Sequence, residues 1–315
     1  MRAFSKINLI LDVIKKRPDG YHELQSVMQT LALHDTLTIA IERGSLTDNR
    51  NGLNQKDQQL NVNPSNASDN SSNRDVDFNL LCSDPCLPTD DSNLVTQAAK
   101  FMIKKYNITQ PVRIYLKKRI PQAAGLAGGS SDCAATLIGL NKLFNLNIPL
   151  HSQCAINLIS IGERFGADVP FCLLGGTALA EGIGERLTPL AFHPHCWVVL
   201  ACPSIHVSTA DVFREWEPTK ATPRNVQAIS KALSQGDLKK IADGFRNDLT
   251  QITTKKYPII NELISEMKSL GALNAAMSGS GPTVFGYFDH KKTAEKAQKH
   301  MKSITGRAFL TEIIS

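Results

Sequence analysis

The run Pro121-Gln-Ala-Ala-Gly125-Leu-Ala-Gly128-Gly129-Ser130-Ser131-Asp132 is followed directly by an apolar segment, 131–144, with a helical pattern. Glycines let backbone N–H groups approach a ligand closely, and a helix start adds unpaired donors and a positive dipole end. Together they predict an anion site suited to the phosphates of a nucleotide. The run is not a Walker A loop, because no lysine follows its last glycine. The alternative is a loop of small residues that only lets a helix pack closely against a sheet.

Strand and helix patterns surround this loop without strict alternation, which predicts an α+β fold and not a doubly wound sheet. Residues 5–14 have the pattern of a strand with one polar face, and 24–42 read as two strands separated around His34-Asp35. Further strands are expected at 111–118, 171–180 and 196–202, and helices at 93–106 and about 152–165. A linker at Pro218 to Pro223 then precedes a mainly helical part, 224–315, with a few strands.

Residues 44–78 differ in composition from the rest of the chain. They contain eight Asn, five Asp, five Ser and three Gln among 35 residues. Such a stretch buries too little apolar area to offset the entropy of ordering, so we expect a disordered polar insertion. Around it we expect two domains, 1–190 and 191–315.

Composition and charge exclude several classes of protein. The 315 residues are 42% hydrophobic and 20% charged, as in ordinary globular proteins. No apolar run reaches the roughly 18 residues of a membrane span, and no signal-peptide pattern opens the chain. The net charge of +6 allows an anionic partner, but the basic residues, Lys117-Lys118-Arg119 among them, are scattered and read mostly as solvated faces. The seven cysteines, with only a C-x3-C at Cys82 and Cys86, predict reduced thiols and no zinc site.

Two isolated charged residues are candidates for chemistry. Asp168, in Gly166-Ala-Asp-Val-Pro170, is expected in a short loop before an apolar strand, where it accepts a proton from a hydroxyl or caps its own turn. Lys6, within an apolar strand, is either an edge residue whose ammonium reaches solvent or a buried cation held for function. Both alternatives stay open at this point.

Three further segments carry weaker signals. Met277-Ser-Gly-Ser-Gly281-Pro-Thr-Val-Phe285 reads as a turn entering a strand, with glycines that would also suit a second phosphate. Tyr21-His22 offers an aromatic face and a hydrogen-bonding ring, although such a pair is more often structural. Glu181-Gly-Ile-Gly-Glu185 is expected to be a plain turn.

Taken in order, these segments resemble the GHMP kinase superfamily. Within it, Ser5-Lys-Ile-Asn-Leu and Arg17-Pro-Asp-Gly-Tyr-His-Glu-Leu resemble the kinases of 4-diphosphocytidyl-2-C-methyl-D-erythritol, and the resemblance covers the chain outside 44–78. It implies an N-terminal domain like ribosomal protein S5 domain 2 and a C-terminal ferredoxin-like domain. It also implies ATP-dependent phosphorylation of the C2 hydroxyl of that substrate in the non-mevalonate route to isoprenoid precursors, with ATP and Mg²⁺ required.

The resemblance further implies roles for individual residues. Lys6 and Asp168 match a catalytic pair, with Asp168 as base or orienter and Lys6 as charge stabiliser. Tyr21 resembles a ring that stacks on the cytosine against Phe213, while His22 reads its polar edge. The remaining substrate contacts would be Asn8, Thr209, Gly279, Ser280 and Gly281. ATP would be bound by Asn93, Pro121, Gln122, Ala123, Ala124, Gly125, Leu126, Ala127, Gly128, Gly129, Ser130 and Ser131.

The chain departs from the superfamily pattern in its phosphate loop. Ala123, Ala124 and Ala127 stand where glycine is common, so we expect negative φ at these positions, since alanine is strained at positive φ. No dedicated carboxylate for Mg²⁺ is evident beyond a contact from Ser130 or Ser131. The metal ligands are therefore left unassigned.

Two other functions compete with this interpretation. One is a different GHMP small-molecule kinase, of the mevalonate or homoserine type, and Tyr21-His22 with Phe213 argues against it. The other is a non-catalytic nucleic-acid-binding module, against which stand Lys6, Asp168 and the lack of a basic stripe. We therefore expect a cytoplasmic enzyme, monomeric or a weak homodimer, that acts on a small molecule and binds neither nucleic acid nor membrane.

Overall fold

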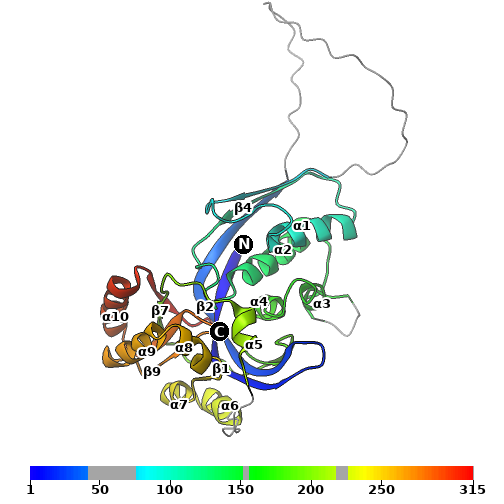
Figure 1. Ribbon diagram of the computed structural model, residues 1–315. Helices are drawn as coiled ribbons and strands as arrows, with labels where there is room; N and C mark the ends of the chain where they lie inside the picture. Colours follow the sequence, from blue (N-terminus) through cyan, green and yellow to red (C-terminus); the bar gives the residue numbers. More distant parts are fainter. Residues whose placement is uncertain (42–75, 152–155, 218–225, 315) are drawn as a thin grey trace, which may run out of the picture.

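The computed structural model describes residues 1–41, 76–151, 156–217 and 226–314 (Figure 1). Its strands are β1 (Arg2–Lys16), β2 (His22–Ile41), β3 (Phe78–Cys82), β4 (Val112–Lys117), β5 (Thr177–Gly182), β6 (Arg186–Pro189), β7 (Trp197–Ala201), β8 (Arg246–Asn247), β9 (Asn274–Met277), β10 (Val284–Phe288) and β11 (Ala308–Glu312). Its helices are α1 (Leu94–Lys105), α2 (Gly128–Leu143), α3 (Leu158–Gly162), α4 (Val169–Leu174), α5 (Thr209–Arg214), α6 (Val226–Gln235), α7 (Leu238–Asp243), α8 (Thr250–Lys256), α9 (Ile259–Ser269) and α10 (Lys291–Thr305).

The larger sheet is built around two long antiparallel strands. Its main order is β3-β4-β2-β1-β8, with β5 and β6 added beside β2. The first half of β2 pairs with β5 and the second half with β4, so one strand spans both parts of the sheet. The expectation of two strands over 24–42 is therefore wrong. Asp35 does not break the strand, because its buried side chain continues the inward register of Leu31 and Leu33.

Helices α1 to α4 lie together beside this sheet, where α2 contacts both β1 and β2 (Figure 1). The helix expected at 93–106 is confirmed as α1, and the one expected at 131–144 starts three residues earlier, at Gly128. Within the described part of 152–165, only Leu158–Gly162 is helical. The strand expected at 171–180 is wrong in its first half, because Val169–Leu174 forms α4 and β5 begins only at Thr177.

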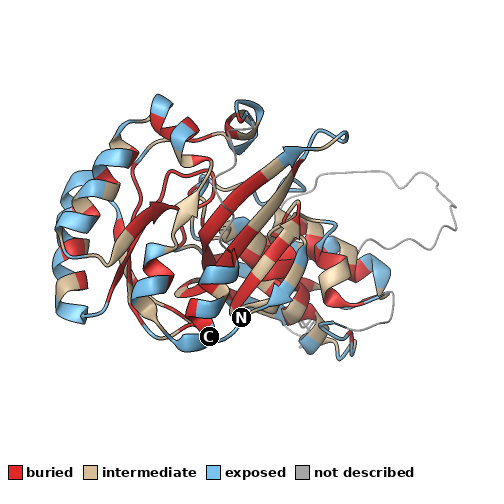
Figure 2. Ribbon diagram, turned by 90° about the horizontal axis from the view of Figure 1, so that it is seen from below, coloured by how far each residue is buried: buried red, intermediate tan, exposed pale blue. Residues whose placement is uncertain are grey.

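The smaller sheet has the order β11-β7-β10-β9, with antiparallel neighbours. This is the order of a ferredoxin-like sheet. Alternate residues of β10 face opposite sides: Phe285 and Tyr287 pack toward β1 and β2, while Val284 and Phe288 pack toward α9 and α10. Figure 2 shows the buried residues in the strands and the exposed ones on the outer helix faces. The two sheets thus share an apolar layer.

The C-terminal end and β8 connect the two sheets. Ile313 forms a bridge with Leu31 of β2, and β8 pairs in parallel with β1 although it lies far along the chain. The expected domain division at residue 190 stays a prediction.

Most of the polar insertion expected at 44–78, and the linker expected at 218–223, lie outside the described residues. The insertion's expected end is wrong, because Phe78 already belongs to β3. Among the described residues, no helix has the length and apolar character needed to cross a membrane.

Candidate functional site

A cavity of about 590 Å³ lies where the phosphate loop, the start of α1, strands β1 and β2, the segment before α4, α5 and the loop after β9 meet. Its volume falls within the range of about 300–1,000 Å³ that is usual for ligand sites. It brings together Lys6, Asp168, Gly125 and Ser280, which are far apart in the sequence. Long pairing of β1 with β2 and the packing of α2 and α4 on β1 fix these positions.

Lys6 is a buried cation, 5% exposed, and not an edge residue. Its Nζ donates to Asn8 Oδ1 at 2.9 Å and lies 3.3 Å from Asp168 Oδ2. Asn8 in turn donates to Ser26 Oγ at 2.8 Å, which orients its amide. The Asp168 side chain is 34% exposed toward the cavity. Asp168 precedes α4 and makes no cap hydrogen bond to it, so the turn-capping alternative does not hold.

The loop before α2 presents backbone donors to the cavity. The N–H groups of Gly125 to Ser130 have no hydrogen-bond acceptor among the described residues, and Ser131 N is the first to bond within the helix, to Ala127 O at 2.9 Å. Such a row of free donors at a helix start is an anion site. Leu126 points into the core and its carbonyl accepts from Lys6 N at 3.1 Å, which ties the loop to β1. Ser131 is buried and donates to Gly128 O, so it reaches the cavity less than Ser130 does.

The expectation of negative φ throughout this loop is wrong for two alanines. Ala123 has φ 47° and Ala127 has φ 56°, both in the left-handed region, whereas Ala124 keeps a negative φ. The reversal at Ala127 turns the chain into α2, for which it is the N-cap residue. The alanines therefore adopt the conformation for which glycine is usual at these positions.

The phosphate loop packs closely against the segment 278–281. Ser278 Oγ donates to Gly125 O at 2.8 Å, and a Cβ on Gly125 would come within 2.2 Å of Ser278 O. Gly279 and Ser280 line the cavity, whereas Gly281 does not. Thr209 of α5 also lines the cavity, with its hydroxyl 2.8 Å from Ser280 Oγ. The segment 278–281 is thus part of the site and not a plain hairpin turn.

Asn93 lines the cavity as the N-cap residue of α1. Its Oδ1 accepts from Val95 N at 2.9 Å, and its Nδ2 donates to Pro88 O at 2.7 Å. The amide is therefore fixed by the protein.

Of the three residues expected to bind the cytosine ring, the structure brings His22 and Phe213 together but not Tyr21. The ring centroid of the buried His22 lies 5.3 Å from that of Phe213 and 5.6 Å from that of Trp216. The Nε2 atom of His22 has no hydrogen-bond partner among the described residues. Burial, followed by the charge of Lys16, lowers the pKa of His22, so the ring is neutral near pH 7. Phe213 lines the cavity, but neither His22 nor Tyr21 is among the lining residues, and Tyr21 is 61% exposed at the β1–β2 turn. The sandwich of Tyr21 and Phe213 stays a prediction.

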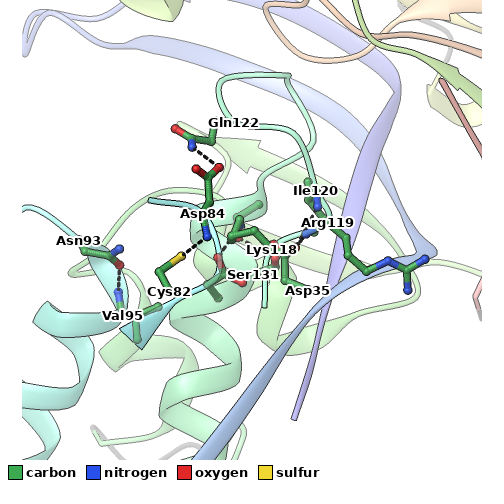
Figure 3. Close-up of polar contacts among 12 residues, drawn as sticks. Asp35, Cys82, Asp84, Asn93, Val95, Lys118, Arg119, Ile120, Gln122 and Ser131 are labelled. Carbon is green, nitrogen blue, oxygen red and sulfur yellow. Dashed lines mark hydrogen bonds and ion pairs between the residues drawn. The ribbon is translucent and has the colours of Figure 1, made fainter. Parts of the chain in front are cut away.

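A buried ion cluster lies beneath the phosphate loop (Figure 3). It was not predicted from the sequence. Lys118 Nζ donates to Asp35 Oδ2 and, at 2.7 Å, to Asp132 Oδ2, while Asp35 Oδ1 accepts from the backbone N–H groups of Arg119 and Ile120. The Lys118 side chain is 8% exposed, so its interpretation as part of a solvated face is wrong. The alternation of the strand pattern could have indicated this burial, because Lys118 continues the series of buried residues Ile114 and Leu116.

The cluster holds two carboxyl groups, Asp35 and Asp132, against the single positive charge of Lys118. Burial, the largest cause, raises the pKa of Asp132 to about 7 against the opposing effect of Lys118. Asp132 Oδ1 is buried without a hydrogen-bond partner among the described residues. Lys118 and Asp132 both line the cavity.

The donor set for a divalent cation is sparse. Within the described ranges, no group of three His, Cys, Asp or Glu side chains could hold a metal. Asp168 and Ser130 do offer hard oxygen atoms at the cavity. Mg²⁺ bound to nucleotide phosphates keeps several waters and needs only one or two protein ligands, so these residues fit it.

Comparison with known proteins gives matches along the whole chain. The family models "GHMP kinases N terminal domain" and "GHMP kinases C terminal" match residues 93–176 and 229–307. A 4-diphosphocytidyl-2-C-methyl-D-erythritol kinase of Caldicellulosiruptor bescii is 38% identical over 100% of this chain and 96% of its own. One from Lachnoclostridium phytofermentans is 41% identical over 94% of this chain and 90% of its own.

Solved structures agree with these relatives. A crystal structure of 4-(cytidine 5'-diphospho)-2C-methyl-D-erythritol kinase superposes with a TM-score of 0.75 at 30% identity, covering 100% of this chain and 99% of that one. A homoserine kinase of Cytophaga hutchinsonii, at 17% identity and a TM-score of 0.67, shares the fold over 100% of this chain and 95% of its own. The GHMP kinase fold expected from the sequence is confirmed, and the chain belongs to the 4-diphosphocytidyl-2-C-methyl-D-erythritol kinase family of the GHMP kinases.

Proposed function

We propose that this kinase transfers the γ-phosphoryl group of ATP to the C2 hydroxyl of 4-diphosphocytidyl-2-C-methyl-D-erythritol, in the non-mevalonate route to isoprenoid precursors. One observation carries the proposal for this chain: Lys6 Nζ lies 3.3 Å from Asp168 Oδ2, beside a row of N–H donors that have no acceptor among the described residues. Phosphoryl transfer requires positioning and charge neutralisation more than covalent help from the protein. A cation, a carboxylate and backbone donors supply both.

In this mechanism the C2 hydroxyl donates a hydrogen bond to Asp168. As its oxygen bonds to the γ-phosphorus, the bond to the bridging oxygen of ADP breaks and the hydroxyl proton passes to Asp168. Lys6 stabilises the negative charge on the transferring group, and its bond to Asn8 holds it in place. The N–H groups from Gly125 to Ser130 bind the phosphates of ATP.

Mg²⁺ on ATP would neutralise phosphate charge. Ser130, which lines the cavity, and Asp168 are the residues that would contact it.

His22 and Phe213 would form the base-binding part of the site. The buried Nε2 of His22 has no hydrogen-bond partner within the described residues, and the polar edge of a cytosine would supply one. Because His22 is neutral, one ring nitrogen donates and the other accepts, as recognition of an amide-like edge requires. Phe213 would stack on the ring, and Tyr21 would close over its other face.

A transfer assay with the purified protein tests this proposal. ATP and Mg²⁺ are supplied with 4-diphosphocytidyl-2-C-methyl-D-erythritol, mevalonate or homoserine, and the phosphorylated products are identified by mass spectrometry and phosphorus NMR. We expect product only from the cytidine-diphosphate alcohol, phosphorylated at C2. Preferential phosphorylation of mevalonate or homoserine would refute the assigned substrate.

A further inference from the structure

The loop that joins β9 to β10 contains two backbone donors with no acceptor in the part of the chain that the structure describes. The N–H groups of Gly279 and Ser280 have no acceptor among the described residues, although both residues are buried and line the cavity. A Cβ on Gly279 would lie 3.7 Å from Asn8 Oδ1 and 3.4 Å from Gly125 Cα. Gly279 therefore lies beside both Asn8 and the phosphate loop.

The carbonyl groups of this loop are held on its other side, chiefly by one side chain. Asn247 Nδ2 donates to Met277 O at 2.8 Å and to Gly279 O at 2.7 Å, which uses both of its hydrogens. Thr253 Oγ1 lies 3.2 Å from both Ser280 O and Leu249 O, which share its single hydrogen. In a planar trans peptide, the C=O of one residue points opposite to the N–H of the next. By fixing Gly279 O, Asn247 therefore sets the direction of the Ser280 N–H.

Asn247 is itself fixed to the strand that carries Lys6. It lies in β8, where it pairs with Leu11 of β1, and its Oδ1 accepts from Leu249 N at 2.9 Å. Its neighbour Asp248 makes two hydrogen bonds with β1. The Asp248 N–H donates to Leu11 O at 2.9 Å, and Asp248 Oδ2 accepts from Val13 N at 3.0 Å. The amide thus connects the strand of the first sheet with the loop of the second.

We propose that Asn247 is a positioning residue for phosphoryl transfer: it holds the Gly279–Ser280 peptide so that the Ser280 N–H donates to an oxygen of a phosphate group bound in the cavity. Donors fixed before the reaction stabilise developing charge without reorganisation during the step. The proposal rests on the phosphotransferase function proposed above. It adds to that function a residue with no expected contact to either substrate.

The test uses Asn247→Asp and Asn247→Ala in the full chain. The aspartate variant keeps the shape of the side chain but places acceptors against two carbonyl oxygens. Asn274→Ala is the matched control, because Asn274 also bonds backbone groups, Ala242 O at 2.7 Å and Ala275 N at 2.9 Å, and does not line the cavity. Thr253→Val is the second variant, which removes a different bond to the same loop.

We expect both Asn247 variants to lower kcat at least tenfold relative to Asn274→Ala, with KM for ATP within threefold of wild type. Thr253→Val should lower kcat less, and the Tm values of the Asn247 variants should fall by no more than that of the control. If the Asn247 variants keep kcat within threefold of the control, or if KM for ATP rises in proportion to the loss, the proposal is wrong. If these variants do not fold, an unchanged kcat in Thr253→Val overturns it. Inactivity of the wild type toward the cytidine-diphosphate alcohol would instead refute the proposed function.

Discussion

Two alanines in the phosphate loop adopt a backbone conformation that alanine disfavours. Ala123 and Ala127 have φ values of 47° and 56°, and an L-residue in the left-handed region costs about 1–2 kcal/mol. Local residue preference favoured the opposite conformation, and the packing of the loop between β1 and the 278–281 segment overrides it. Functional loops commonly hold such conformations because the surrounding structure imposes them.

Ala127→Gly is therefore expected to stabilise the protein. The variant relieves the left-handed alanine but loses about 0.5–1 kcal/mol to the greater freedom of glycine in the unfolded chain, so the net gain in unfolding free energy is about 1 kcal/mol or less. Thermal unfolding measures it as a higher Tm. Ala124→Gly is the control, because Ala124 is 5% exposed with negative φ and glycine there should lower the Tm. Equal losses in both variants would contradict the interpretation.

Tyr21 and Phe213 are the aromatic residues proposed to bind the cytosine ring of the substrate. If Tyr21 closes over a cytosine held on Phe213, both Tyr21→Ala and Phe213→Ala should raise KM for the cytidine-diphosphate substrate at least fivefold, since stacking on a base is worth about 1–3 kcal/mol. KM for ATP should stay within threefold in steady-state assays. Tyr21 is 61% exposed, so its removal should not unfold the protein. A rise with Phe213→Ala alone would show that Tyr21 does not contact the base.

At the scale of elements, the cluster of Lys118, Asp35 and Asp132 joins β2, the segment after β4 and helix α2 beneath the phosphate loop. Alternation alone places Lys118 and Asp35 on the buried faces of their strands. Their mutual pairing was not predictable, because 83 positions separate them and register between strands is a tertiary property. Local pattern also could not distinguish helix from strand at α4, where a strand was expected, because a short apolar run fits a buried helix and a buried strand equally well.

This cluster makes stability depend on pH. The unfolded Asp132 carboxyl ionises near pH 4, whereas the folded protein keeps its proton until about pH 7. Between about pH 4 and pH 7 only the unfolded state releases that proton, so this group lowers stability as pH rises. The Tm difference between Asp132→Asn and wild type should therefore shift in favour of the variant from about pH 5 to about pH 8. A shift in the opposite direction, or none, would contradict the raised pKa.

At the scale of the whole molecule, the site exists only where separate parts of the chain meet. Lys6 and Asp168 were each open to a purely structural interpretation from their own positions, and only the resemblance to the GHMP kinases paired them. The phosphate loop was predictable from its own residues, because its glycines and serines are more than close packing of a helix requires. The contact between Lys6 and Asp168, the interlock of Gly125 with Ser278 and the bonds of Asn247 were not, since each joins elements from distant parts of the chain. Local patterns identify such groups, and packing decides which of them meet.

In the proposed mechanism, the Asp168 carboxylate beside Lys6 accepts the proton of the substrate hydroxyl during phosphoryl transfer. The most direct measurement is the steady-state turnover of ATP with 4-diphosphocytidyl-2-C-methyl-D-erythritol by wild type, Asp168→Asn and, as a control, Asp289→Asn, whose carboxylate is 51% exposed and does not line the cavity. We predict that Asp168→Asn lowers kcat at least about 100-fold, with KM for ATP and Tm nearly unchanged, while the control keeps full turnover. A kcat for Asp168→Asn within threefold of wild type would contradict this role of Asp168.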